Sequence, residues 1–182
     1  MSVRATFSAG APLACIALLV LLTGCTAVTS PSPRITNSAP VAVSPLVPAA
    51  PESLDVAAAQ TESERLVAQL VSTIPGAQVR NNDSHSQEVV KTIAPGGHYW
   101  GVITTLSLTA STKAAPVARA LAKSLTAAGW IQRDSTDTST NFLSALASSG
   151  DRKTAWFVVV GADLSVATQP VVTVQLASPD LP

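Results

Sequence analysis

The sequence predicts an α+β domain in which two helices pack on one face of a curved, mostly antiparallel sheet. Two stretches have the apolar spacing of amphipathic helices, and several others alternate apolar and polar residues as half-buried strands do. Turns that contain glycine, proline or asparagine separate the strands. The elements run in the order helix, strands, helix and then a run of strands, which favours a helix layer on an antiparallel meander.

The first helix is expected over residues 61–74. Thr61 and Glu64 have the spacing of a capping box, in which two side chains satisfy free amides of the first turn. Pro75 and Gly76 then end the helix. Residues 54–60 could add earlier turns, with Ser53 as the cap. The apolar face of this helix consists of Leu66, Val67, Leu70, Val71 and Ile74.

Three strands are expected between the two helices. A short strand over residues 77–80 is followed by a turn at 81–84, and a second strand over 87–93 ends at a Pro-Gly-Gly turn at 95–97. The strand over 98–109 has the clearest alternation. Its core face carries Trp100, Val102, Leu106 and Leu108, interrupted by Thr104.

The second helix is expected to begin near Pro116 and to end before Gly129. Proline suits a first helical turn, and glycine suits the left-handed residue that follows a helix. Trp130 is then placed to close a Schellman-type cap. The buried stripe of this helix is Val117, Leu121, Leu125 and Ala128.

The last third is predicted to be mostly strand. Strands are expected to begin at Trp130 and to cover residues 142–148, 154–160 and 171–177. Residues 134–140 are expected to form a loop, and residues 149–152 and 161–163 to form turns. The strand over 154–160 is apolar on both faces, which predicts a central position in the sheet.

The amino-terminal residues have the layout of a secretory signal. Arg4 supplies positive charge, and residues 11–22 form an apolar stretch of about a dozen residues. That stretch is shorter than the roughly 20 residues of a membrane-spanning helix. It ends in Leu22-Thr23-Gly24-Cys25.

This tetrapeptide resembles the lipobox of bacterial lipoproteins, in which an aliphatic residue, a small residue and Gly or Ala precede a cysteine. The resemblance implies a diacylglycerol on the thiol of Cys25, cleavage by signal peptidase II between Gly24 and Cys25, and a location on the extracytoplasmic face of the cell membrane. Two or more acyl chains hold a protein firmly to a bilayer. The alternatives are an ordinary secretory signal, cleaved at another small residue, and a retained anchor.

Residues 25–53 are expected to be a disordered tether between the signal peptide, residues 1–24, and a single folded domain, residues 54–182. Proline fixes φ and lacks an N–H, so no helix or central strand persists where it recurs. As an alternative, residues 41–43 and 46–47 could dock on the domain or on a partner. The prolines of the tether are Pro31, Pro33, Pro40, Pro45, Pro48 and Pro51.

The whole layout resembles small actinobacterial lipoproteins of the LppA-like kind. The shared features are the lipobox, the spacer rich in proline and serine, and a helix that ends in Ala-Ala-Gly-Trp, here Thr126 to Trp130, before a strand. This second resemblance brings no catalytic residues with it.

Composition excludes several classes of function. Charged residues make up 12% of the chain and the net charge is zero, which argues against nucleic acid as a partner and against electrostatic adhesion to anionic lipid. The two cysteines are Cys15, in the signal, and Cys25. The remaining chain therefore has no disulfide and no cysteine metal site.

No residue cluster predicts catalysis. Asp83, His85 and Glu88 could be assembled into a metal site, but we expect a solvated turn there. Asp134 and Asp137 are too few for calcium, so a solvated loop is expected. The sequence has no G-x-S-x-G nucleophile elbow, and residues 95–98 lack the ending of a phosphate loop. We therefore expect no enzyme, cofactor or metal.

The leading hypothesis is a non-enzymatic interaction or scaffolding domain, held at the membrane through Cys25, with an envelope protein or a lipid as its partner. The alternative is a carrier or sensor of an apolar ligand such as a lipid, bound in a cavity between the helices and the sheet. The residues expected to line that cavity are Trp100, Val102, Leu106, Leu121, Leu125, Trp156 and Val158.

Overall fold

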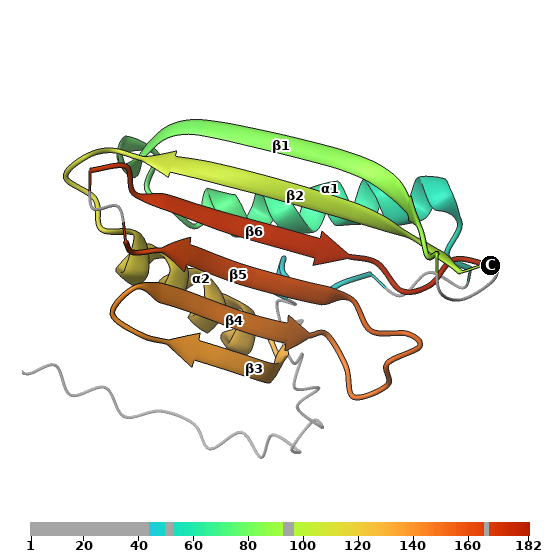
Figure 1. The fold of residues 1–182 in the computed structure, drawn as a ribbon. Coiled ribbons are helices and arrows are strands. Elements are labelled where there is room, and N and C mark those ends of the chain that lie inside the picture. Colours follow the sequence, from blue (N-terminus) through green and yellow to red (C-terminus); the bar gives the residue numbers. More distant parts are fainter. Residues whose placement is uncertain (1–43, 50–52, 93–96, 166–167) are drawn as a thin grey trace, which may run out of the picture. The chain divides into compact units, whose positions relative to one another are not determined.

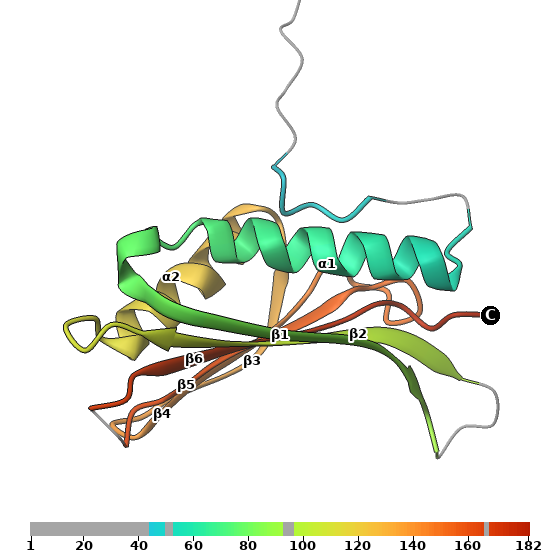
Figure 2. The same cartoon turned by 90° about the horizontal axis from the view of Figure 1, so that it is seen from above.

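The computed structural model describes residues 44–49, 53–92, 97–165 and 168–182, and the account below concerns these residues. Two helices lie on one face of a six-stranded antiparallel sheet (Figures 1 and 2), which confirms the predicted α+β class. The elements are α1 (Val56–Ser72), a 3₁₀ turn (Gly76–Gln78), β1 (Val79–Val90), β2 (His98–Leu108), α2 (Ala114–Ala127), β3 (Ile131–Asp137), β4 (Asn141–Ala147), β5 (Phe157–Asp163) and β6 (Val171–Ala177).

The strand order is β1-β2-β6-β5-β4-β3, and every neighbouring pair is antiparallel. β3 to β6 form the expected meander, and β6 returns beside β2. Helix α1 packs mainly on β2, whereas α2 packs on β4 and β5 (Figure 2). The two helices together cover one face of the sheet and leave the other face open.

The core lies between the helices and the covered sheet face. Even-numbered side chains of β2, β4, β5 and β6 point into it, as the period of two requires. Thr104, the polar interruption on β2, is also fully buried and bonds to the Ser84 hydroxyl at 2.9 Å. The least exposed large side chains include Leu66, Leu70, Leu106, Leu121, Leu125, Leu146, Val158, Val160 and Val174.

Helix α1 begins earlier than the capping box predicted. The carboxylate of Asp55 accepts from the Ala58 N–H at 2.8 Å, so Asp55 is the N-cap. Thr61 lies inside the helix, where its hydroxyl donates to the Ala57 carbonyl. Of the added turns predicted over 54–60, residues 56–60 are confirmed, and the cap is neither Ser53 nor Thr61. Three consecutive alanines favour helix and let Asp55 act as the cap.

Strand β1 corrects the prediction of two short strands with a turn at residues 81–84. Asn81 to Ser84 pair with β2 residues 104–107 in one continuous ladder. Turn-forming residues are accepted here because β1 is an exposed edge strand, and the neighbouring strand supplies its hydrogen bonds. The expected turn at residues 95–96 and the end of the strand at Ile93 lie outside the described residues.

Strands β3 and β5 also run further than expected. Residues 134–137, predicted as a loop, belong to β3 and pair with β4. Residues 161–163, predicted as a turn, complete β5, whereas 154–156 precede that strand. A Cβ at Gly161 would lie 3.0 Å from the Thr173 hydroxyl, so this glycine permits a close approach between strands.

The carboxyl end of α2 has the predicted Schellman cap. Gly129 has φ 96°, its N–H donates to the Thr126 carbonyl, and the Trp130 N–H donates to the Leu125 carbonyl at 3.1 Å. The Trp130 side chain is 3% exposed and belongs to the core. The cap therefore both ends the helix and points the indole inward.

We predict that Gly129→Ala lowers the free energy of unfolding by about 1–2 kcal/mol, because an L residue at this φ is strained. Space is not the cause, since nothing lies within 4 Å of a Cβ built at Gly129. The matched control is Gly150→Ala, where the Cβ also meets nothing within 4 Å and φ is not positive. Urea unfolding measures both. Equal stability of the two variants would contradict the argument.

Candidate functional site

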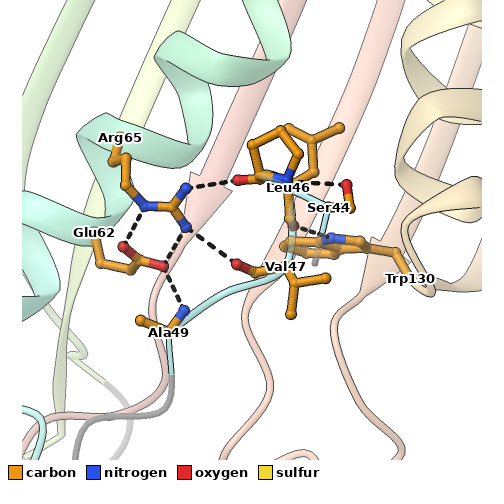
Figure 3. Close-up of polar contacts among 8 residues, drawn as sticks. Ser44, Leu46, Val47, Ala49, Glu62, Arg65 and Trp130 are labelled. Carbon is orange, nitrogen blue, oxygen red and sulfur yellow. Dashed lines mark hydrogen bonds and ion pairs between the residues drawn. The ribbon is translucent and has the colours of Figure 1, made fainter. Parts of the chain in front are cut away.

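Residues 44–49, which we call the strap, pack on the helix layer (Figure 3). Leu46 is 5% exposed and belongs to the hydrophobic core. The indole Nε1–H of Trp130 donates to the Leu46 carbonyl at 2.8 Å. The strap thus contacts Trp130, the residue that closes the cap of α2. The two residues that form this bond are 84 positions apart in the chain.

Two charged residues of α1 hold the other side of the strap. Arg65 donates through Nη1 to the Pro45 carbonyl at 2.6 Å and through Nη2 to the Val47 carbonyl at 3.1 Å. Glu62 accepts from the Ala49 N–H at 2.6 Å. Arg65 also forms a two-bond ion pair with Glu62, at 2.7 and 2.6 Å (Figure 3). Helical spacing of three residues places both side chains on one face.

The composition of the strap explains why it needs these donors. Pro45 and Pro48 have no N–H, so the strap has more carbonyl acceptors than donors. Backbone carbonyls at a packed surface must still accept hydrogen bonds. The guanidinium group of Arg65 donates to two of these carbonyls at once, and the indole of Trp130 donates to a third.

The environment of the Glu62–Arg65 pair shifts both groups toward the charged form. Burial alone would raise the pKa of Glu62, but hydrogen bonds from Arg65 and the Ala49 amide outweigh burial, and the pKa lies below its ordinary value. The hydrogen bond to Glu62 raises the pKa of Arg65 above its ordinary value. The strap is therefore held by an ion pair that stays charged at neutral pH.

The strap revises the expected boundary of the domain. Residues 25–53 were predicted to be a disordered tether, but the packed segment includes Ser44 to Ala49. The alternative that residues 46–47 dock is confirmed for Leu46, whereas Val47 is 37% exposed. Residues 41–43, the second part of that alternative, lie outside the described residues. So do the signal peptide, Gly24 and Cys25.

The seven residues predicted to line an apolar cavity lie where the helices face the sheet, with Leu121 and Leu125 on α2 itself. All except Trp100 belong to the buried core and are at most 3% exposed. Trp100 is partly buried against the core, and its Nε1–H donates to the Ser86 hydroxyl at 2.7 Å. Two of the seven also reach hollows open at the surface, Val102 near β1 and Trp156 near the strap.

The open face of the sheet carries an apolar hollow of about 400 Å³. Gly101, which has no side chain, lies within it. This hollow was not predicted from the sequence, although its signal is the second face of β2, which carries Tyr99, Gly101 and Ile103. Apolar residues that line it include Val89, Tyr99, Ile103, Phe157, Val159 and Ala177.

Charged pairs elsewhere join elements of the fold. His98 lies between the Pro182 carbonyl and the Glu88 carboxylate, and these two contacts, the first above all, raise the pKa of His98. Arg119 on α2 bonds to Asp137 on β3 at 2.8 and 2.6 Å. Asp137, which was expected in a solvated loop, therefore lies on β3 and binds the helix layer through Arg119.

Asp83, His85 and Glu88 do not converge as a set of three, although the His85 Nε2 lies 3.6 Å from the Asp83 Oδ1. Asp83 and His85 share the open sheet face with their partners Thr105 and Ile103, whereas Glu88 points to the helix side. Over the ranges that the structure describes, no three acidic, histidine or cysteine side chains group as metal ligands would. In the same ranges, no helix has the length and apolar character needed to cross a membrane.

Comparison with known proteins adds no relative. No family model, no curated protein and no solved structure matches the chain.

We predict that Leu46→Ala lowers the free energy of unfolding by about 2–3 kcal/mol, because it removes a buried side chain from the core. Proteolysis within residues 44–49 should also become faster. Val47→Ala is the matched control, since it shortens an exposed neighbour and should cost less than about 0.5 kcal/mol. A Leu46→Ala variant no less stable than this control would show that the strap is not packed.

We predict that the contribution of Glu62 to the free energy of unfolding decreases in acid. A carboxyl whose folded pKa is lowered adds stability above its unfolded pKa, near 4.3, and loses it as pH falls through the folded value. Glu62→Gln should therefore be less stable than the parent chain at pH 7, by about 1.5–3 kcal/mol, and the difference should shrink toward pH 3.

Urea unfolding at a series of pH values tests this prediction. Glu64→Gln is the control, because Glu64 lies on the same helix and its carboxylate bonds to Gln60 and Ser86 and to no strap atom. At pH 7 this control should lose less stability than Glu62→Gln, because it removes no bond to the strap. A Glu62→Gln difference that stays constant down to pH 3 would contradict the argument.

Proposed function

We propose that the chain is a lipid-anchored lipoprotein of a bacterial envelope whose folded domain acts by binding rather than by catalysis. The observation that carries the proposal is Leu22-Thr23-Gly24-Cys25 at the end of a short apolar run. A thiol is a strong nucleophile and suits thioether formation with a lipid. The anchor then places the domain on the extracytoplasmic face of the cell membrane.

The strap supports a tethered arrangement. Roughly 19 residues separate Cys25 from Ser44, and a chain of that length reaches at most about 65 Å when fully extended. Contacts of the strap with Arg65, Glu62 and Trp130 define where this length joins the domain. A fixed junction suits a domain that must meet a partner close to the bilayer.

The surface of the domain supports binding. Within the described residues, one sheet face is free of helices and has an apolar hollow of about 400 Å³, a feature typical of contact with an apolar group. The ion pairs Glu62–Arg65 and Arg119–Asp137 join parts of the fold rather than meeting in a cleft. We propose an envelope protein or a lipid as the partner, and no nucleic acid.

Cys25→Ala should abolish lipidation. Mass spectrometry of the membrane-extracted parent chain should find acyl mass on Cys25, and the variant should be released from the membrane or remain an uncut precursor. Cys15→Ala is the matched control, because Cys15 lies within the signal and should leave lipidation unchanged. A parent chain that is unmodified and freely soluble in culture would refute the proposal.

A further inference from the structure

Strand β1 forms a free edge of the sheet (Figure 1). It is 12 residues long and, in the described part of the chain, pairs with β2 alone. The Lys91 N–H donates toward the β2 side, to the Gly97 carbonyl. Because hydrogen-bonding direction alternates along a strand, the amides and carbonyls of Asn82, Ser84 and Ser86 point away from β2.

This edge has few of the features that prevent strands from pairing. Proteins protect sheet edges with short strands, bulges, proline and lysine. The opposite edge, β3, is seven residues long and has a bulge between Gln132 and Asp134. β1 has neither proline nor lysine, is exposed over residues 80–88, and has its one irregularity at the start, between Val79 and Asn81.

The sequence of β1 is complementary to itself when reversed about Ser84. In an antiparallel pair centred there, Asp83 lies opposite His85 of the second copy, and the bulged residue Arg80 lies near Glu88, which also contacts His98 of its own chain. Each contact occurs twice by symmetry, and complementary side chains on neighbouring strands, here a carboxylate acceptor opposite an imidazole donor, are stabilising. Polar residues also meet polar residues, with Asn81 opposite Gln87 and Asn82 opposite Ser86.

Neighbouring registers lose this complementarity. A centre at Asp83 places that carboxylate opposite its own copy, and like charges directly opposite are destabilising. A centre at His85 places Asp83 opposite Gln87 and Glu88 opposite Asn82, so no opposite charges meet. A register centred between two residues is also excluded. It would place a residue whose backbone N–H and C=O point away from β2 opposite one whose groups point toward β2, so the hydrogen-bond ladder could not form.

We propose that two copies of this chain associate through β1, antiparallel and centred on Ser84, so that the two six-stranded sheets join edge to edge. Helix α1 lies mainly over β2, and a hollow of about 390 Å³ separates it from the helix side of β1 near Asn82, Ser84 and Thr104. The second strand therefore has room to approach. The association needs no lipid, although anchoring two copies to one membrane would raise their effective concentration.

Disulfide trapping tests both the edge and the register. The full chain carries Cys15→Ser and Cys25→Ser, so that an added cysteine is its single thiol and the lipid plays no part. In the proposed pair the two Cα atoms at Ser84 are about 5.5 Å apart, within disulfide range. Ser84→Cys should therefore give a covalent dimer under mild oxidation.

Two controls use the same chemistry. Ser135→Cys places the thiol on the opposite edge strand, β3. Ser86→Cys places it on β1, but about 13 Å along the strand from its copy. Both should remain mostly monomeric. If Ser84→Cys forms no more dimer than Ser135→Cys, the edge does not pair with itself, and if Ser86→Cys forms equal dimer, the register is wrong. Either result overturns the proposal.

A reversible measurement supplements the trapping. Ser84→Pro removes an outward-facing N–H and leaves the ladder with β2 intact, and proline is tolerated in an edge strand at such a position. Analytical ultracentrifugation should find the dissociation constant raised at least about tenfold relative to Ser84→Ala. Ser84→Ala controls for loss of the hydroxyl bond to Thr104. Equal association of the two variants would also overturn the proposal.

Discussion

Burial of one face of the sheet is the constraint on which the rest of the structure depends. The central strands present mostly apolar side chains on that face, with Leu106, Val160 and Val174 fully buried and Thr104 and Ser144 as the buried polar exceptions. At about 25 cal/mol per Å² of apolar surface, covering this face is the main favourable term available to a domain without disulfides. Two helices are needed because the sheet is six strands wide. Helix α1 covers one half and α2 the other.

The same constraint gives the remaining surfaces their character. The covering layer consists of two separate helices. Leu46, which belongs to neither helix, also packs into the core. Side chains on the uncovered face are apolar near Gly101 and polar toward β1. The sheet is open, so both edge strands keep unpaired backbone on one side within the described ranges. Each exposed feature thus follows from which surface the helices cover.

Elements with local signals could be predicted from the sequence. Strand β2, helix α2 and the cap at Gly129 each depend on residues close together in the chain, and all three are confirmed. Strand was predicted at both ends of β1, but its continuity through residues 81–84 could not be predicted, because the ladder with β2 overrides a run of turn-forming residues. The start of α1 was ambiguous, since Asp55 and Thr61 are both competent caps.

The candidate site was less accessible to prediction. Docking of residues 46–47 was one of two alternatives, and apolar character alone did not decide between them. The decision depends on Arg65 and Trp130, which lie far from the strap in sequence and supply donors to its carbonyls. The hollow around Gly101 likewise depends on β5 and β6 lying beside β2. Such contacts are set by the tertiary fold.

The strap also determines how the domain responds to mechanical force. Tension applied to the chain before Ser44 is resisted first by the contacts of the strap with Arg65 and Trp130, so the amino end of α1 carries no load until those contacts yield. Their rupture frees about ten residues, which span at most about 35 Å when fully extended, before tension acts directly on the amino end of α1. We therefore expect the chain to lengthen under tension by release of the strap before the sheet unfolds.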